Sequence, residues 1–188
     1  MRPASEAELA ELVAGSKGPL VVRGGGTRTL GHAVGEVLET GGLSGVELYE
    51  PGALTLVARA GTPLAQVDAV LAAERQRLSF DPPDLRALLG RNGVSTLGGV
   101  VAANASGPRR VQSGAARDAL LGVRFVDGSG TVIKNGGRVM KNVTGYDLVK
   151  LLAGSRGTLG VLTEVSFKVQ AMPEAEATLV IELSLIHI

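Results

Sequence analysis

The sequence contains no cysteine and no tryptophan, and its 188 residues include only two histidines. Without cysteine the chain cannot form a disulfide, a thiol nucleophile, a cysteine-bound zinc site or an iron–sulfur cluster of its own. His32 lies in a glycine-containing loop and His187 lies in the C-terminal tail, so neither is well placed as a general base or a metal ligand. The residues therefore indicate no catalytic group, and we expect no metal site.

Aromatic residues and long apolar runs are also scarce. Aromatics make up 3% of the chain and the net charge is +1, which argues against a stacking platform for single-stranded nucleic acid. No segment approaches the roughly 18 consecutive apolar residues of a membrane span, and the N-terminus reads as an acidic amphipathic helix rather than a signal peptide. We expect a cytoplasmic protein, associated with the inner membrane at most through partner subunits.

Glycine is abundant, with 27 residues, about twice the usual share of roughly 7%. The first cluster is Arg23-Gly24-Gly25-Gly26-Thr27, directly after the apolar run 20–22. Such a loop can expose backbone N–H groups to a pyrophosphate, although a tight loop without a ligand explains it equally well. The spacing does not fit a Rossmann fingerprint, and no Gly-Lys-Ser or Gly-Lys-Thr of a P-loop occurs.

Two further clusters follow, at residues 96–107 and 154–160. The segment 96–107 combines small residues with the hydrogen-bonding side chains of Thr96, Asn104 and Ser106, which favours a ligand over a close-packed turn. In the segment 154–160, a helix C-cap explains Gly154 but not Gly157 or Gly160.

The hydrophobic pattern predicts an α+β fold of short elements. Helices are expected at 5–15, at 64–71 after a cap at Thr62-Pro63, and at 147–153 after a cap at Thr144 that we prefer to a ligand contact by Lys141 or Tyr146. Short strands are expected at 20–23, 36–39, 46–49 and 54–59, a hairpin at 123–134 around Asp127-Gly128-Ser129-Gly130, a half-buried strand at 161–169 and a further strand at 178–183. A short helix capped by Ser95 or Thr96 is expected to point its N-terminus at the ligand.

Phe80-Asp81-Pro82-Pro83 cannot continue a helix and is the expected boundary between two lobes. The predicted organisation is a first lobe at 1–83, a second lobe at 84–172, and the start of a truncated cap domain at 173–188.

The three glycine clusters, in this order along the chain, resemble the motifs of a known family. Two further segments carry the same resemblance: Thr144-Gly145-Tyr146-Asp147-Leu148, and Val161-Leu162-Thr163-Glu164 directly after the third cluster. They are similar to the PCMH-type FAD-binding domain of the vanillyl-alcohol oxidase, or FAD-linked oxidase, superfamily. Within it the likeness is greatest to the E-subunit family of bacterial glycolate oxidase. The resemblance covers roughly residues 5–175 and implies two α+β lobes that clasp an extended FAD.

The resemblance also implies which residues bind the cofactor. By motif these are Arg23, Gly24, Gly25, Gly26 and Thr27 at the pyrophosphate; Thr96, Gly98, Gly99, Ala102, Asn104, Ser106 and Gly107 along the phosphates and flavin; and Gly114, Asp118, Val161 and Leu162 to complete the pocket. Some members attach flavin through a histidine in the first loop, where this chain has Gly26 and Thr27, so we expect noncovalent FAD. A Gly25→Asp substitution is expected to abolish flavin binding and leave the fold intact. Arg109, Arg110 and Arg117 could neutralise phosphate, although solvated surface arginines are the usual interpretation.

The implied function is oxidation of glycolate to glyoxylate by hydride transfer to flavin, with a small 2-hydroxy acid as substrate. The implied partners are a second flavoprotein subunit and an iron–sulfur subunit. Two alternatives remain: a stand-alone 2-hydroxyacid or alditol oxidase of the same superfamily, and a noncatalytic assembly subunit with a degenerate flavin site.

Overall fold

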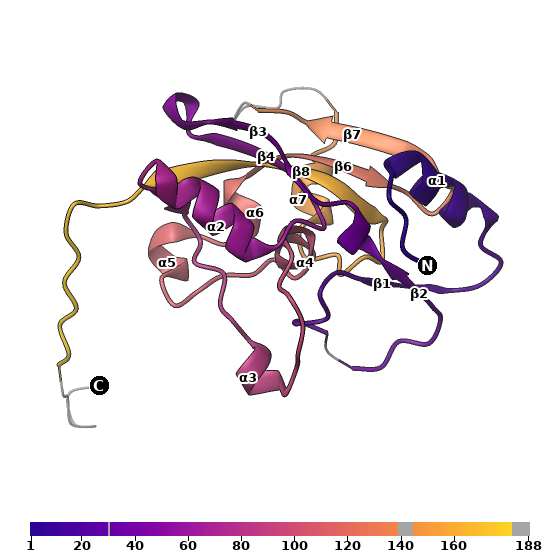
Figure 1. The fold of residues 1–188 in the computed structure, drawn as a ribbon, viewed down its shortest axis with the longest axis horizontal. Helices are drawn as coiled ribbons and strands as arrows, with labels where there is room; N and C mark the ends of the chain where they lie inside the picture. Colours follow the sequence, from indigo (N-terminus) through magenta and orange to yellow (C-terminus); the bar gives the residue numbers. More distant parts are fainter. Residues whose placement is uncertain (30, 139–144, 182–188) are drawn as a thin grey trace.

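A computed structural model of the chain describes residues 1–29, 31–138 and 145–181, which fold into two sheets with short helices around them (Figure 1). The smaller sheet is a parallel pair, β1 (Leu20–Arg23) and β2 (Glu36–Glu39). The larger sheet is antiparallel, with the order β3-β4-β8-β6-β7, and β5 also pairs with β8. Its strands are β3 (Val46–Glu50), β4 (Thr55–Arg59), β5 (Gln76–Leu78), β6 (Leu120–Val126), β7 (Val132–Gly136) and β8 (Val161–Ala171). The α+β class is therefore confirmed.

Seven α-helices and two short 3-10 turns connect the strands in the described part of the chain. They are α1 (Glu6–Gly15), α2 (Leu64–Ala73), α3 (Arg86–Leu89), α4 (Leu97–Ala102), α5 (Arg110–Ser113), α6 (Ala116–Ala119), α7 (Leu148–Leu152), η1 (Thr40–Gly42) and η2 (Pro51–Ala53). None of the helices in the described ranges is both long and hydrophobic enough to cross a bilayer.

Strand β8 lies at the centre of the larger sheet. It pairs with β4 on one side, with β6 on the other, and with β5 at its C-terminal end. The expected half-buried alternation is wrong, because Val161 joins an apolar core under α1 and the next residue, Leu162, joins the main core. Both faces of the strand are covered there, so its first three residues, Val161, Leu162 and Thr163, are all buried.

The hairpin predicted at 123–134 is confirmed. Strands β6 and β7 pair antiparallel, with Val126 opposite Val132. The carboxylate of Asp127 accepts hydrogen bonds from the backbone N–H groups of Ser129 and Thr131, each at 2.9 Å, which closes the turn.

Helix starts follow the predicted capping rules in two cases. The Ser5 hydroxyl accepts the Glu8 N–H at 3.1 Å at the start of α1, and Thr96 accepts the Gly99 N–H at 3.3 Å at the start of α4.

One predicted cap is wrong, and another falls outside the described residues. Thr62 does not cap α2, because its hydroxyl donates to the Arg59 carbonyl oxygen at 2.7 Å and accepts the Gly45 N–H at 2.9 Å. Helix α7 is capped by Asp147, which accepts the Lys150 N–H at 3.1 Å. The preferred cap, Thr144, and its neighbour Lys141 lie outside the described residues.

The sheets do not divide the chain at residue 83, because β3, β4 and β5 pair within the larger sheet together with strands from beyond that residue. The two FAD-binding lobes stay a prediction. After β8, residues 173–181 run out from the body (Figure 1) and contain no strand, so the strand predicted at 178–183 is wrong for 178–181. Its last two positions lie outside the described residues.

Candidate functional site

Four separate segments of the chain meet at one narrow crevice of about 70 Å³. The lining residues are Val22, Gly24, Thr40, Gly98, Gly99, Ala102, Ser155, Arg156, Gly157, Gly160 and Leu162. Five of them are predicted cofactor-binding residues: Gly24, Gly98, Gly99, Ala102 and Leu162. The structure thus brings members of all three glycine clusters together.

The first loop uses its glycines for two physical reasons. Gly26 has a φ of +69°, which L-residues other than glycine adopt at a cost. Gly24 and Gly25 are needed for close packing instead: a Cβ at Gly24 would lie 2.3 Å from Thr96 Oγ1, and one at Gly25 would lie 1.5 Å from the Val94 carbonyl oxygen. A Gly25→Asp variant therefore displaces the loop itself, and the expectation that it spares the fold is not supported by this geometry.

The loop still offers donors to a ligand. The backbone N–H groups of Gly25, Gly26 and Thr27 donate no hydrogen bond to any residue that the structure describes. Amide groups that the protein leaves unpaired in a glycine loop are suited to anionic oxygens such as those of a pyrophosphate. Arg23, at the end of β1, is exposed.

Arg28 fastens this loop to the rest of the protein. Its Nη1 donates to the hydroxyls of Thr27, at 3.2 Å, and of Ser95, and its Nη2 donates to the Pro83 carbonyl oxygen at 2.6 Å. Burial lowers the pKa of the Arg28 guanidinium, and the charge of Asp84 acts in the opposite direction. No part of the sequence reasoning singled out this residue.

Helix α4 lines the crevice with glycine and alanine residues, Gly98, Gly99 and Ala102. The backbone N–H groups of its first turn donate hydrogen bonds to other parts of the protein. The Gly98 N–H donates to the Ala60 carbonyl oxygen at 2.7 Å, and the Leu97 N–H donates to Thr62 at 2.9 Å. The Gly99 N–H is taken by the Thr96 cap. Gly98 and Gly99, in the first turn of this helix, nevertheless line the crevice, and the expectation that the helix N-terminus faces the ligand stays a prediction.

Two polar residues of the second cluster make contacts within the protein. Asn104 has a φ of +46°, and its Oδ1 accepts the Arg117 N–H at 3.0 Å. The Ser106 hydroxyl accepts a hydrogen bond from Arg110 Nη1 at 3.1 Å. These contacts shape the turn after α4, and a cofactor role for either side chain stays a prediction.

Gly107, Gly114 and Asp118 lie away from the crevice lining. The Gly107 N–H donates to the Phe80 carbonyl oxygen at 2.9 Å. Asp118 Oδ2 accepts the Ala115 N–H at 2.8 Å, and a Cβ at Gly114 would lie 2.7 Å from that same oxygen. Asp118 lines a second, larger cavity instead.

The third glycine cluster supplies site residues that the sequence reasoning noted but did not assign. Gly157 packs against Val22, where a Cβ would lie 3.0 Å from the valine Cβ. Arg156 has a φ of +54° and donates its backbone N–H to the Ala102 carbonyl oxygen at 2.9 Å. A non-glycine residue with a left-handed backbone beside a crevice lined by glycines is a signal of function that only the structure reveals. Val161, a predicted site residue, is buried in the core under α1.

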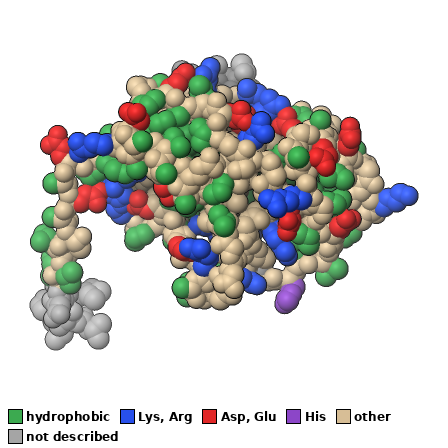
Figure 2. Space-filling view, viewed as in Figure 1, with side chains coloured by type: hydrophobic (Ala, Val, Ile, Leu, Met, Phe, Trp, Pro, Cys, Tyr) green, Lys and Arg blue, Asp and Glu red, His purple; other side chains and the backbone are tan. Residues whose placement is uncertain are grey.

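Arg156 is exposed and forms no ion pair with a described residue. By contrast, Arg109 pairs with Asp81, outside the crevice lining. On the face shown in Figure 2, Lys and Arg side chains are interspersed with Asp and Glu, in keeping with the net charge of +1. His32 is exposed, and the described residues hold no group of three or more His, Asp or Glu that could bind a metal.

The crevice fits part of a dinucleotide cofactor. Its walls are mostly glycine and alanine, which allow a ligand to approach the backbone, and the adjoining loop has unpaired N–H groups. Arg156 and the hydroxyls of Thr40 and Ser155 add polar groups suited to phosphate oxygens.

Comparisons with known proteins agree with this chemistry. Residues 1–136 match the family model described as FAD binding domain. The chain is 43% identical over 171 residues to glycolate oxidase subunit GlcE of Escherichia coli K12, covering 90% of this chain and 47% of that protein. It is 35% identical to glycolate oxidase subunit GlcD of Bacillus subtilis 168, covering 86% of this chain and 34% of that protein. With a D-lactate dehydrogenase of Archaeoglobus fulgidus the identity is 37%, over 80% of this chain and 33% of that protein.

Among solved structures, an alkyldihydroxyacetonephosphate synthase has the same fold, with a TM-score of 0.75 at 24% identity, over 93% of this chain and 32% of that one. The chain spans about half or less of the length of these relatives. Its cofactor class is nevertheless settled, because the family model covers most of its residues. The chain belongs to the FAD-binding domain family of the FAD-linked oxidoreductases.

Proposed function

We propose that this chain is the FAD-binding part of a flavoprotein subunit that oxidises a small 2-hydroxy acid, with glycolate converted to glyoxylate. The named activities of its relatives, glycolate oxidase and D-lactate dehydrogenase, support oxidation of hydroxy acids as the class. We further propose that it works in a complex with a second flavoprotein subunit and an iron–sulfur subunit.

The observation that carries the proposal is the meeting of Gly24, Gly98-Gly99 and Gly157 at one crevice. When bound, FAD supplies the hydride acceptor. The chain binds the cofactor and fixes its position, through the N–H groups of the first loop and the charge of Arg156. The unpaired N–H groups argue against the alternative of an assembly subunit with a degenerate site. A stand-alone 2-hydroxyacid or alditol oxidase remains the second candidate.

The first experiment is an absorbance spectrum of the purified full-length protein, taken before and after acid precipitation, with chromatography of the released flavin. We expect flavin bands in the native protein and FAD in the acid supernatant, because the first loop has no histidine for covalent attachment. A full-length protein that stays colourless and takes up no added FAD would contradict the proposal.

Arg156→Gln tests the crevice directly. We expect the dissociation constant for FAD to rise about 10- to 150-fold, since one charge-assisted phosphate contact contributes about 1.5–3 kcal/mol. The matched control is Arg75→Gln, because Arg75 is also an exposed arginine with a left-handed φ, of +52°, but lies outside the crevice. Equal FAD affinity in both variants would remove Arg156 from the site.

The substrate is tested with the assembled complex. Addition of glycolate is expected to bleach the oxidised-flavin absorbance and to release glyoxylate. Unchanged glycolate oxidation by a complex that lacks this subunit would instead favour the assembly role.

A further inference from the structure

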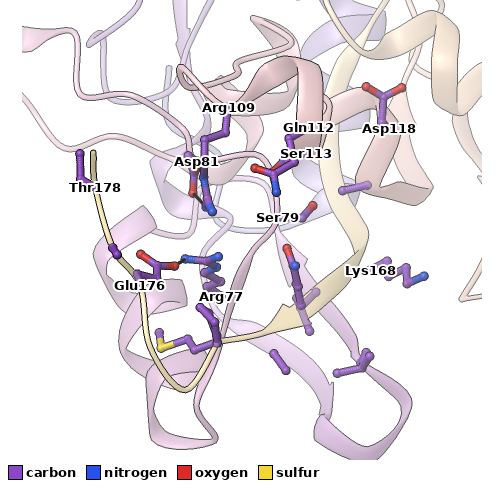
Figure 3. A pocket seen from close by; sticks show the side chains of 18 residues that line it. Arg77, Ser79, Asp81, Arg109, Gln112, Ser113, Asp118, Lys168, Glu176 and Thr178 are labelled. Carbon is purple, nitrogen blue, oxygen red and sulfur yellow. Dashed lines mark hydrogen bonds and ion pairs between the residues drawn. The ribbon is translucent and has the colours of Figure 1, made fainter. Parts of the chain in front are cut away.

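A second cavity, of about 1500 Å³, lies apart from the crevice, beside the C-terminal half of β8 (Figure 3). Its walls come from β5, from the residues at α5 and α6, and from the segment that follows β8. The family comparison and the crevice give this cavity no role. Its polar side chains include two arginines, Arg77 and Arg109, which differ in their hydrogen-bond partners.

Arg109 forms a two-point ion pair within the protein. Its Nε and Nη2 donate to the two carboxylate oxygens of Asp81, at 2.6 and 2.8 Å. The hydrogen bond from Arg109 lowers the pKa of Asp81. Arg109 therefore serves as a fixed wall of the cavity.

Arg77, on β5, is occupied only in part. Its Nη1 donates to Glu176 Oε1 at 2.6 Å, whereas its Nε is buried and has no hydrogen-bond partner among the described residues. The side chain of Arg77 is 21% exposed, but that of Glu176 is 59% exposed and comes from a segment without secondary structure. In Figure 3 this segment turns back past the cavity, so that Glu176 points at Arg77.

An arginine binds a carboxylate best through two parallel N–H donors, and a buried donor without an acceptor is costly. Glu176 accepts a hydrogen bond from Nη1 of Arg77 and leaves the Nε donor unpaired. Because exposed ion pairs contribute little to stability, a small carboxylate can replace Glu176 at low cost.

We propose that this cavity binds a small carboxylic acid on Arg77, and that Glu176 is an internal carboxylate that occupies the position when no ligand is bound. Ser79, which also lines the cavity, can contact a hydroxyl on the ligand, as a 2-hydroxy acid would carry. The site requires no flavin, so it is independent of the proposed cofactor binding.

Calorimetric titration of the full-length protein, prepared without FAD, tests the site with glycolate and acetate as probes. Glu176→Gln removes the competitor, and we expect it to bind glycolate about tenfold more tightly. Arg77→Gln should lose glycolate binding. Arg77→Lys keeps the positive charge but not the two parallel N–H donors, so its affinity for glycolate should lie between those of the unmodified protein and Arg77→Gln. Arg86→Gln is the control, because Arg86 is also paired with a carboxylate, that of Asp84, but lies outside the cavity.

Unchanged affinity in both Glu176→Gln and Arg77→Lys would overturn the proposal, even if Arg77→Gln fails to fold. Glycolate binding more tightly than acetate would show that the site also reads the hydroxyl, and equal binding would show that it reads the carboxylate alone. A second titration with FAD-loaded protein separates the two proposals. If the protein binds FAD but no carboxylate, the carboxylate site is rejected and the proposed function stands. If it binds a carboxylate on Arg77 but no FAD, the proposed function is rejected and the carboxylate site stands.

Discussion

Gly25 and Gly26 are neighbours in the first glycine cluster, but a Cβ atom would meet different surroundings at the two positions. At Gly25 it would overlap the Val94 carbonyl oxygen at 1.5 Å. At Gly26 the nearest atom would be Arg23 Cδ at 3.9 Å, and only the φ of +69° opposes a side chain. Glycine is required at position 25 because a side chain would overlap neighbouring backbone, and at position 26 because the backbone is left-handed.

These two positions give a matched pair of variants. Gly26→Ala is expected to lower the free energy of unfolding by about 1–2 kcal/mol, the cost of a left-handed alanine. Gly25→Ala is expected to cost more, about 3 kcal/mol, because backbone must move. Urea denaturation of the FAD-free protein measures both, and equal losses would show that the loop adapts to the added methyl group at Gly25.

Arg28 is expected to hold the first loop at the correct distance from α4. Arg28→Met removes its hydrogen bonds to Ser95 and Pro83 and keeps most of the side-chain volume. We expect weaker FAD binding by about tenfold, since hydrogen bonds to charged groups contribute about 1.5–3 kcal/mol. A double-mutant cycle with Ser95→Ala, measured as FAD affinity, should show coupling between the two residues. Additive effects would mean that Arg28 does not act through Ser95.

At the scale of elements, α1 is fastened to the larger sheet by one acidic side chain. Glu6 accepts hydrogen bonds from Arg124 on β6 and from Thr163 Oγ1 on β8, the latter at 2.5 Å. Burial alone would raise the pKa of Glu6, but the hydrogen bonds from Arg124 and Thr163 outweigh it, so that the pKa lies below its ordinary value of 4.5.

A lowered pKa in the folded state fixes the sign of the pH dependence. The contribution of Glu6 to stability is complete above pH 4.5, its ordinary value, and is lost as the pH falls through the lower folded value. Arg124→Met should therefore destabilise the protein at pH 7 and much less at pH 3, as measured by urea denaturation. Lys17→Met is the control, because it removes a positive charge that has no ion pair with a described residue. A loss in Arg124→Met that is the same at both pH values would contradict this account.

The sequence predicts elements well where the signal is local. The hairpin around Asp127 and the Ser5 and Thr96 caps depend on residues within a few positions of one another, and all three are confirmed. Thr62 fails as a cap because its hydroxyl bonds to the Arg59 carbonyl oxygen and to the N–H of Gly45, which lies 17 residues earlier in the sequence. The burial of β8 on both faces depends on α1, more than a hundred residues earlier in the sequence, and alternation along the strand cannot reveal it.

At the site, too, local signals predict residues that long-range contacts then place. The resemblance to FAD-binding domains identified the glycine clusters, but their contacts come from the fold. Val22, Thr40 and Arg156 line the crevice without a sequence signal of their own. Asp118, carried over by motif, lies in the other cavity.

At the scale of the whole molecule, FAD should contact several segments that are distant in the sequence. Hydrogen exchange of the full-length protein with and without FAD is expected to show slower exchange at 24–27 and at 155–160, which line or adjoin the crevice. Residues 127–131, in the turn between β6 and β7, should be unchanged and serve as the internal control. Slower exchange at only one of the two glycine segments would mean that the cofactor does not bridge them.

The central position of β8 also decides when the protein can fold during its synthesis. Thr55 of β4 pairs with Lys168 of β8, so the β3–β4 pair and the β6–β7 pair lack the strand that joins them until residue 168 has left the ribosome. At about 5–20 residues per second, several seconds pass between the synthesis of β4 and that of β8. Such long-range pairing also slows folding itself, to about milliseconds to seconds. During that interval the apolar faces of the earlier strands are exposed, and the nascent chain is expected to depend on chaperones that bind unpaired strands.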